Sequence, residues 1–140
     1  MIIKSLATFL LLIVNPFASA LTINEIMSNP IGDDNGREWL ELYNDTGETI
    51  DISGLTISIK GGAPIAIVPV SGGTSIAPFG YAIVGSVVNG VTKFSLDHPN
   101  YSGPLFRSSI SLVNTGVTSL DIRLGGSVIY TISSYTAAKE

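Results

Sequence analysis

The residues best suited to chemistry gather in one stretch, NPIGDDNGREWLELYN, which runs from Asn29 to Asn44. This stretch holds two aspartates, an Asn-Gly pair and two glutamates around the single tryptophan of the chain. Carboxylates clustered in this way can bind a cation, act as a general acid and base, or shape a turn. The residues around them decide between these three possibilities.

A calcium loop is the first chemistry that the DDNG segment at positions 33–36 suggests. If Gly36 took the sixth position of an EF-hand loop, Ile31 and Leu42 would fall at the first and twelfth positions, where neither can bind calcium. The favoured interpretation is a turn in which Asp and Asn side chains accept hydrogen bonds from nearby backbone amides and Gly36 supplies a positive φ. A weak calcium site of another type stays open, with oxygen ligands from Asp33, Asp34 and Glu38.

Paired carboxylates for glycoside hydrolysis are the second possibility. Glu38 and Glu41 are an odd number of residues apart on one predicted strand, so they point to opposite faces and cannot flank one bond. Glu25 could approach Glu41 from a neighbouring strand, but the sequence indicates no cleft there, and we predict no carboxylate pair on a common face.

Nucleophilic and metal-dependent chemistry is not indicated either. The only histidine, His98, lies beside Pro99, no nucleophile elbow is present, and the chain has no cysteine. One histidine without cysteine makes a zinc or copper site improbable. We therefore expect a protein that is not an enzyme, with no catalytic residues, no metal and no cofactor.

The first twenty residues have the layout of a secretory signal peptide. Lys4 begins a short positive region, an apolar run follows from Leu6 to Val14, and a small-residue site ends at Ala20. The apolar run is shorter than the roughly 20 residues that a helix needs to cross a bilayer. We expect residues 1–20 to be cleaved, residues 21–140 to form one domain, and the protein to be secreted or to lie at the cell surface.

The charge balance narrows the range of partners. The chain carries 11 acidic and 7 basic residues, for a net charge of −4. A negative surface repels phosphate backbones and anionic lipids. We expect no nucleic-acid partner and no stable membrane insertion after cleavage.

Short alternating segments dominate the chain after Leu21. Apolar and polar residues alternate in LTISIK at 55–60 and in LDIRL at 120–124, which is the period of a half-buried strand. Glycine-rich turns separate such segments, and Gly125-Gly126 is the clearest two-residue hairpin turn. No run has a helical period. We predict an all-β sandwich or barrel, with strands near Leu21–Met27, Glu38–Asn44, Thr49–Lys60 with a break at Gly54, Ala66–Val70, Tyr81–Val84, Ser109–Val113, Ser119–Leu124 and Ser127–Ile132.

The first predicted strand contains a carboxylate on its apolar face. Leu21, Ile23 and Met27 alternate, and Glu25 falls on the same face. A buried unpaired carboxylate would cost several kcal/mol. Either Glu25 is paired or a β-bulge at Asn24-Glu25 rotates it outward, and we favour the bulge because it also turns the next residue, an isoleucine, inward.

Aromatic residues define the candidate binding surface. The segment from Ser86 to Ser108 reads as a long loop over one end of the sandwich, whose aromatic side chains either plug the open end of the core, which we favour, or form a recognition surface. On the predicted strand at 38–44, Leu40 and Leu42 face the core. The other face carries an aromatic stripe that is either exposed for binding or covered by the loop. The candidate binding residues are Trp39, Tyr43, Phe94, Tyr101 and Phe106.

The order of motifs resembles the lamin tail domain in its bacterial, secreted form. The matching features are an INEI opening strand, a loop with Asn-Pro and DDNG, the EWLELYN strand, a DISG turn, a PFGY strand entry and a late LVNTG turn. The resemblance covers Leu21 to Tyr135 and departs at Leu55, where the family usually has tryptophan. It implies an immunoglobulin-like β-sandwich without catalytic residues. Similar bacterial domains occur in secreted or surface proteins and are generally taken as adhesive or targeting modules.

These observations favour a secreted, noncatalytic module that binds protein or carbohydrate at a cell surface or in a matrix. The alternative is an accessory or targeting domain of a secreted hydrolase or nuclease whose catalytic part is absent from this chain. The acidic balance argues against the DNA association that has been linked to animal lamin tails.

Overall fold

The computed structural model describes residues 20–114 and 117–136. The predicted signal peptide, apart from Ala20, lies outside the described residues. The described part is all-β, with one helical turn, α1 (Phe94–Asp97). Its strands are β1 (Leu21–Met27), β2 (Trp39–Asn44), β3 (Ile50–Asp51), β4 (Thr56–Ile59), β5 (Ile65–Ala66), β6 (Val68–Ser71), β7 (Ser75–Ile76), β8 (Tyr81–Ser86), β9 (Leu105–Ser108), β10 (Val117–Leu124) and β11 (Ser127–Thr136).

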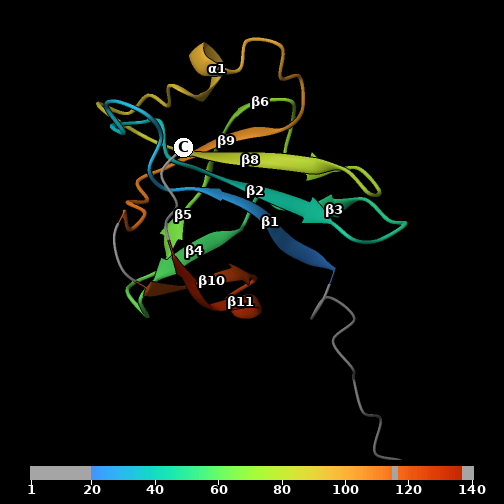
Figure 1. Cartoon of the computed structure of the whole chain (residues 1–140). Coiled ribbons are helices and arrows are strands. Elements are labelled where there is room, and N and C mark those ends of the chain that lie inside the picture. Colours follow the sequence, from blue (N-terminus) through green and yellow to red (C-terminus); the bar gives the residue numbers. More distant parts are fainter. Residues whose placement is uncertain (1–19, 115–116, 137–140) are drawn as a thin grey trace, which may run out of the picture.

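Two main sheets share one hydrophobic core. A five-stranded sheet has the order β1-β2-β8-β9-β6, and a four-stranded sheet has the order β11-β10-β4-β5. In Figure 1 the two sheets lie one above the other, and α1 lies on the far side of the five-stranded sheet. The core contains Leu40 and Leu42 from one sheet and Ile57 and Ile122 from the other, all fully buried. The prediction that Leu40 and Leu42 face the core is therefore confirmed.

The predicted two-residue turn at Gly125-Gly126 connects β10 and β11. Gly125 and Gly126 have φ values of +58° and +83°, which glycine adopts without the steric cost that other residues meet. Two positive φ values in succession characterise the type I′ turn, whose twist matches the flanking strands. Leu124 pairs with Ser127 across this turn.

The β-bulge in β1 is also present. The register between β1 and β2 shifts between Ile23 and Glu25. After the shift, Glu25 is exposed and Ile26 packs against the core. The prediction that a bulge turns these two side chains in these directions is confirmed.

Two predictions about the second half of the chain are wrong. Residues 109–113 do not form a strand, and the strand in this region is instead β9, within the segment predicted to be a loop. β9 pairs in parallel with β8, and parallel neighbours in a sheet require a long crossover connection. Residues 87–104 make this crossover, so they cover the outer face of the five-stranded sheet rather than one end of the core.

The segment that precedes β2 is held to the crossover by a hydrogen bond and an ion pair. Lys93 N donates to Gly36 O at 2.7 Å, and the Arg37 guanidinium pairs with Asp97 at 3.2 Å. Within residues 20–114 and 117–136, helical backbone is confined to the single turn α1, and no helix there is long and apolar enough to cross a membrane.

Candidate binding site

The outer face of the five-stranded sheet carries a second, smaller hydrophobic cluster. It consists of Trp39 from β2, Ile83 from β8, Phe94 from α1 and Leu105 from β9, with Tyr101 packed against it. Odd-numbered residues of β2 point outward because side chains alternate along a strand. The crossover therefore buries Trp39 to 8% exposure on the face opposite the main core.

The rings in this cluster contact one another edge to face or stacked. The centroid of Phe94 lies 5.6 Å from that of Trp39, 5.3 Å from that of Tyr101 and 4.4 Å from that of His98. Such pairs contribute about 0.5 to 1.5 kcal/mol beyond the area they bury. The aromatic contacts therefore hold the crossover against the sheet.

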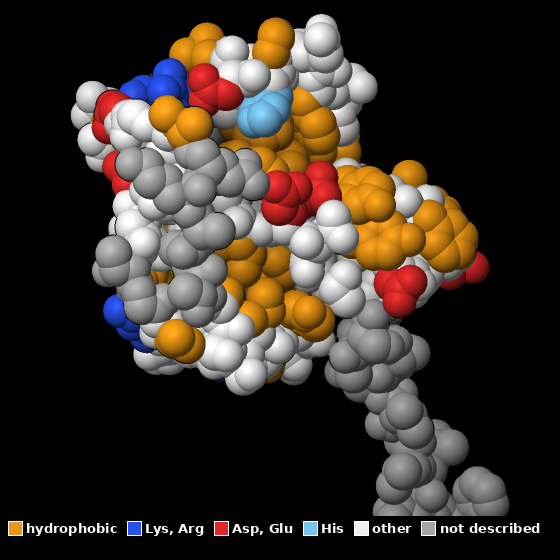
Figure 2. All heavy atoms as spheres, viewed as in Figure 1, with side chains coloured by type: hydrophobic (Ala, Val, Ile, Leu, Met, Phe, Trp, Pro, Cys, Tyr) orange, Lys and Arg blue, Asp and Glu red, His pale blue; other side chains and the backbone are white. Residues whose placement is uncertain are grey.

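Beside this cluster lies a cleft of about 620 Å³. This volume is in the range of small-ligand pockets, which are mostly apolar with a few polar groups. Figure 2 shows hydrophobic side chains below the single histidine, with acidic side chains beside them. The cleft is lined by Glu25, Met27, Trp39, Glu41, Ile83, Phe94, Asp97, His98, Pro99, Asn100 and Tyr101.

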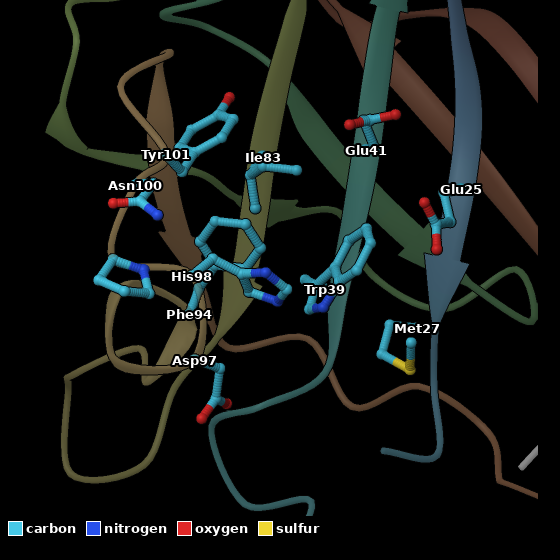
Figure 3. Close-up of a pocket in the computed structure, with 11 residues that line it drawn as sticks. Glu25, Met27, Trp39, Glu41, Ile83, Phe94, Asp97, His98, Asn100 and Tyr101 are labelled. Carbon is cyan, nitrogen blue, oxygen red and sulfur yellow. The ribbon is translucent and has the colours of Figure 1, made fainter. Parts of the chain in front are cut away.

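Two glutamates lie side by side at the sheet side of the cleft. Glu25 and Glu41 are direct partners in the β1–β2 register, and Figure 3 shows them on adjacent strands next to Trp39. The prediction that the chain has no carboxylate pair on a common face is wrong. The bulge in β1 is the physical reason, because without its extra residue Glu25 would share the inner face with Ile23.

The crossover supplies the opposite side of the cleft. Figure 3 shows Asn100 and Tyr101 across from the two glutamates, with Phe94 and His98 between. The Tyr101 hydroxyl donates to Pro104 O at 3.1 Å. Burial, and then the negative charge of Glu41, raise the pKa of Tyr101 to about 12. The hydroxyl therefore keeps its proton at physiological pH.

A hydrogen bond holds one of the two glutamates. Asn24 Nδ2 donates to Glu41 Oε1 at 2.7 Å, while Glu41 itself is only partly buried. None of the residues that line the cleft, all of them in the described part of the chain, is a lysine or arginine. Two carboxylates next to aromatic rings make an environment that attracts a positively charged group.

The five predicted binding residues separate into three places. Trp39, Phe94 and Tyr101 come together at the cleft. Tyr43 lies on the outer face of β2 but outside the cleft, with its ring centroid 4.8 Å from that of Tyr81. Phe106 is fully buried in the core between the sheets, because its position in β9 points its side chain inward. The prediction that the aromatic residues of the loop plug the open end of the core is wrong, because Phe94 and Tyr101 pack on the outer face of the sheet and Phe106 is a core residue of β9.

Sequence reasoning did not identify Glu25, Glu41, His98 and Asn100 as members of the site. The alternation in β1 gave a signal for Glu25, since it required the carboxylate to leave the core face. The pairing of Glu25 with Glu41 depends on a register that no local pattern specifies. His98 and Asn100 reach the cleft only through the crossover.

The DDNG segment forms the turn that the sequence predicts. Asp33 Oδ1 accepts hydrogen bonds from the backbone N and the side-chain Nδ2 of Asn35, at 3.1 and 2.7 Å, and Gly36 has a φ of +73°. Asp33 Oδ2 lies 3.3 Å from Lys93 Nζ. The backbone hydrogen bond from Asn35, followed by the contact with Lys93, lowers the pKa of Asp33. No group of three or more His, Cys, Asp or Glu suited to a metal occurs within residues 20–114 and 117–136.

Glu38 is the most perturbed carboxylate outside the cleft. It is 8% exposed, and its Oε2 accepts a hydrogen bond from Leu112 N at 3.2 Å. Burial, with a smaller contribution from the charge of Asp34, raises its pKa from the ordinary value of 4.5 to about 7. The carboxylate thus connects the start of β2 to the segment at 110–114.

Comparison with protein-family models, curated proteins and solved structures finds no match for this chain.

Proposed function

We propose that the protein is a secreted, noncatalytic binding module that holds a lysine or arginine side chain of a partner protein in the aromatic cleft. The observation that carries this proposal is the register pairing of Glu25 with Glu41 beside Trp39, in a cleft whose described lining contains no lysine or arginine. A cation near two carboxylates gains Coulomb energy, and one above an aromatic ring also gains from the ring quadrupole.

The form of the cleft supports a protein side chain as the ligand. Its walls are largely apolar, so the methylene groups of a long basic side chain can pack there while the charged head reaches the carboxylates. The net charge of −4 favours the approach of a basic partner. Neutral carbohydrate also packs on aromatic rings and can donate hydroxyl hydrogen bonds to carboxylates, but it lacks the positive charge that two adjacent carboxylates attract.

An immunoglobulin-like sandwich of the lamin tail type is the fold that we propose for the module. Support comes from two stacked sheets with a common core and from the ordered motifs of the sequence. In this proposal the domain lies at the cell surface or in a matrix, exported by a signal peptide over residues 1–20. Mass spectrometry of exported material should then give an N-terminus at Leu21, and an intact Met1 would contradict export by cleavage at this site.

Trp39 provides a direct test because it is the only tryptophan. Its fluorescence should change when a short arginine-containing peptide is added, with weak affinity that falls as salt rises. The same peptide with citrulline in place of arginine keeps the shape and removes the charge, and it should produce little change.

Matched variants connect the binding to the acidic pair. Glu41→Gln should weaken binding of the arginine peptide at least fivefold, because it removes a charge while keeping a side chain of the same shape. Glu48→Gln makes the same chemical change at an exposed position outside the cleft and should have no effect. Equal binding of the citrulline peptide, or salt-independent binding of a neutral oligosaccharide at Trp39, would contradict the proposal and favour carbohydrate.

A further inference from the structure

A second cavity lies on another part of the molecule, between the DDNG turn and the segment at 110–114. Its volume is about 190 Å³. Its lining includes Asp34, Glu38, Ser86 and Asn114, and each of these four side chains carries an oxygen atom. These residues come from the turn, the start of β2, the end of β8 and the segment that follows β9, so only the folded chain brings them together.

Several contacts hold these four residues close to one another. Asn114 Nδ2 donates to Asp34 Oδ2, and the backbone N of Ser86 donates to the backbone O of Glu38 at 2.8 Å. Glu38 Oε2 accepts from Leu112 N, two residues before Asn114. These contacts thus hold distant parts of the chain together around the cavity.

Two buried side-chain oxygen atoms of the lining residues have no hydrogen-bond partner within the part of the chain that the structure describes. They are Ser86 Oγ, on a side chain that is only 2% exposed, and Asn114 Oδ1. Leaving a buried polar atom unsatisfied costs about 1 to 3 kcal/mol. Both atoms belong to groups that can donate their lone pairs to a cation.

The charges around the cavity are also uncompensated. Asp34 and Glu38 both line it, and neither belongs to an ion pair formed by the described residues. Asp34 is partly buried and Glu38 is buried, and burying a carboxylate without a cation is unfavourable. Asp33 differs from Asp34 in this respect, since its two oxygens are taken by Asn35 and Lys93.

We propose that this cavity is a calcium-binding site whose protein ligands are oxygen atoms of Asp34, Glu38, Ser86 and Asn114. Calcium prefers carboxylate, carbonyl and hydroxyl oxygens and tolerates irregular geometry, with water completing its shell of six to eight ligands. Magnesium demands a tighter octahedral arrangement. Two carboxylates are few for a calcium site, so an affinity of about 0.1 to 1 mM is expected, in the range of extracellular modules.

The site differs from the one that the sequence suggested in its set of ligands. That set was Asp33, Asp34 and Glu38, and the structure removes Asp33 and adds Ser86 and Asn114. Ser86 follows Asp34 by 52 positions in the sequence. No spacing in the sequence could have indicated this ligand.

Calcium titration of the purified protein tests the proposal, with isothermal calorimetry for affinity and thermal melting for stabilisation. The wild type should bind one calcium ion with the affinity given above, melt at higher temperature with calcium, and respond more weakly to magnesium. Asp34→Asn keeps the size of the side chain and should weaken calcium binding at least tenfold. Asp33→Asn removes a charge at the adjacent position and should change the affinity less than twofold.

Ser86→Ala gives an independent measure, because it removes a neutral ligand and therefore leaves the net charge unchanged. It should weaken calcium binding several-fold without lowering the melting temperature in chelator. Absence of binding up to 10 mM calcium would overturn the proposal, and so would equal losses in Asp33→Asn and Asp34→Asn, which would indicate nonspecific attraction to the acidic turn. Circular dichroism of each variant establishes that it is folded.

Discussion

The burial of Glu38 predicts how the stability of this protein depends on pH. Its pKa is raised to about 7 in the folded chain, against an ordinary value of 4.5. A carboxyl group with a raised pKa binds more protons in the folded state than in the unfolded state at intermediate pH. Its contribution to stability is therefore complete below about pH 4.5 and is lost as the pH rises through about 7.

The size of the effect follows from the linkage between proton binding and folding. One pKa unit corresponds to about 1.4 kcal/mol, so the rise from 4.5 to about 7 corresponds to about 3 kcal/mol when the pH is well above both values. Of this contribution to the free energy of unfolding, about 2.5 kcal/mol should be lost as the pH rises from about 5 to about 8.

Glu38→Gln isolates this contribution from those of the other titrating groups. Glutamine keeps an oxygen that can accept the hydrogen bond from Leu112 N, but it does not ionise. Urea denaturation of both proteins, in chelator so that no cation contributes, gives the free energy of unfolding at each pH. The wild type should lose stability relative to Glu38→Gln as the pH rises.

Glu48→Gln is the matched control, since Glu48 is exposed. Its free energy of unfolding should run parallel to that of the wild type. If Glu38→Gln also ran parallel to the wild type from pH 5 to pH 8, or if the wild type gained relative stability with rising pH, then burial would not govern this carboxylate and the argument would be refuted.

Three further predictions concern the core, the crossover and activity. Leu40→Ala should lower the free energy of unfolding by about 2 to 5 kcal/mol, and Asp121→Ala by far less, because Leu40 is fully buried and Asp121 is not; a reversed order in denaturation would contradict the strand phase. Gly85→Ala should displace the crossover, since an added Cβ would lie 2.2 Å from Thr92 Oγ1, and faster hydrogen exchange at 92–101 together with a weaker peptide response at Trp39 would reveal it. The protein should hydrolyse no glycosides, because its paired glutamates lie on one side of the cleft rather than flanking a bond, and turnover that Glu41→Gln abolishes would contradict this.

Local patterns were sufficient for much of the fold. Alternation located β10 and both faces of β2, since a half-buried strand imposes a period of two. Glycines marked the turn at Gly125-Gly126, and the misplaced carboxylate at Glu25 indicated the bulge. Each of these features depends on neighbours within a few residues, which a single sequence displays.

Parallel pairing was not predictable in the same way. Leu105, Phe106 and Ser108 are all buried in β9, as is typical of a parallel strand covered on both faces, so alternation is weak there. The only alternation in β9 is at Arg107, which is exposed between the buried residues Phe106 and Ser108. Pro99 and Pro104 indicated a loop instead. The parallel partner, β8, is separated from β9 by the whole crossover.

The cleft requires both the β-bulge in β1 and the parallel pairing of β8 with β9. The bulge in β1 places Glu25 beside Glu41 on the outer face, but a flat sheet face with two glutamates would be open to water. The parallel pairing of β8 with β9 carries residues 87–104 across that same face, where Phe94 and Tyr101 build the opposite wall. A chain with an antiparallel hairpin between β8 and its neighbour would keep the acidic pair and lose the cleft. The cleft in this protein is therefore a consequence of sheet topology as much as of the residues that line it.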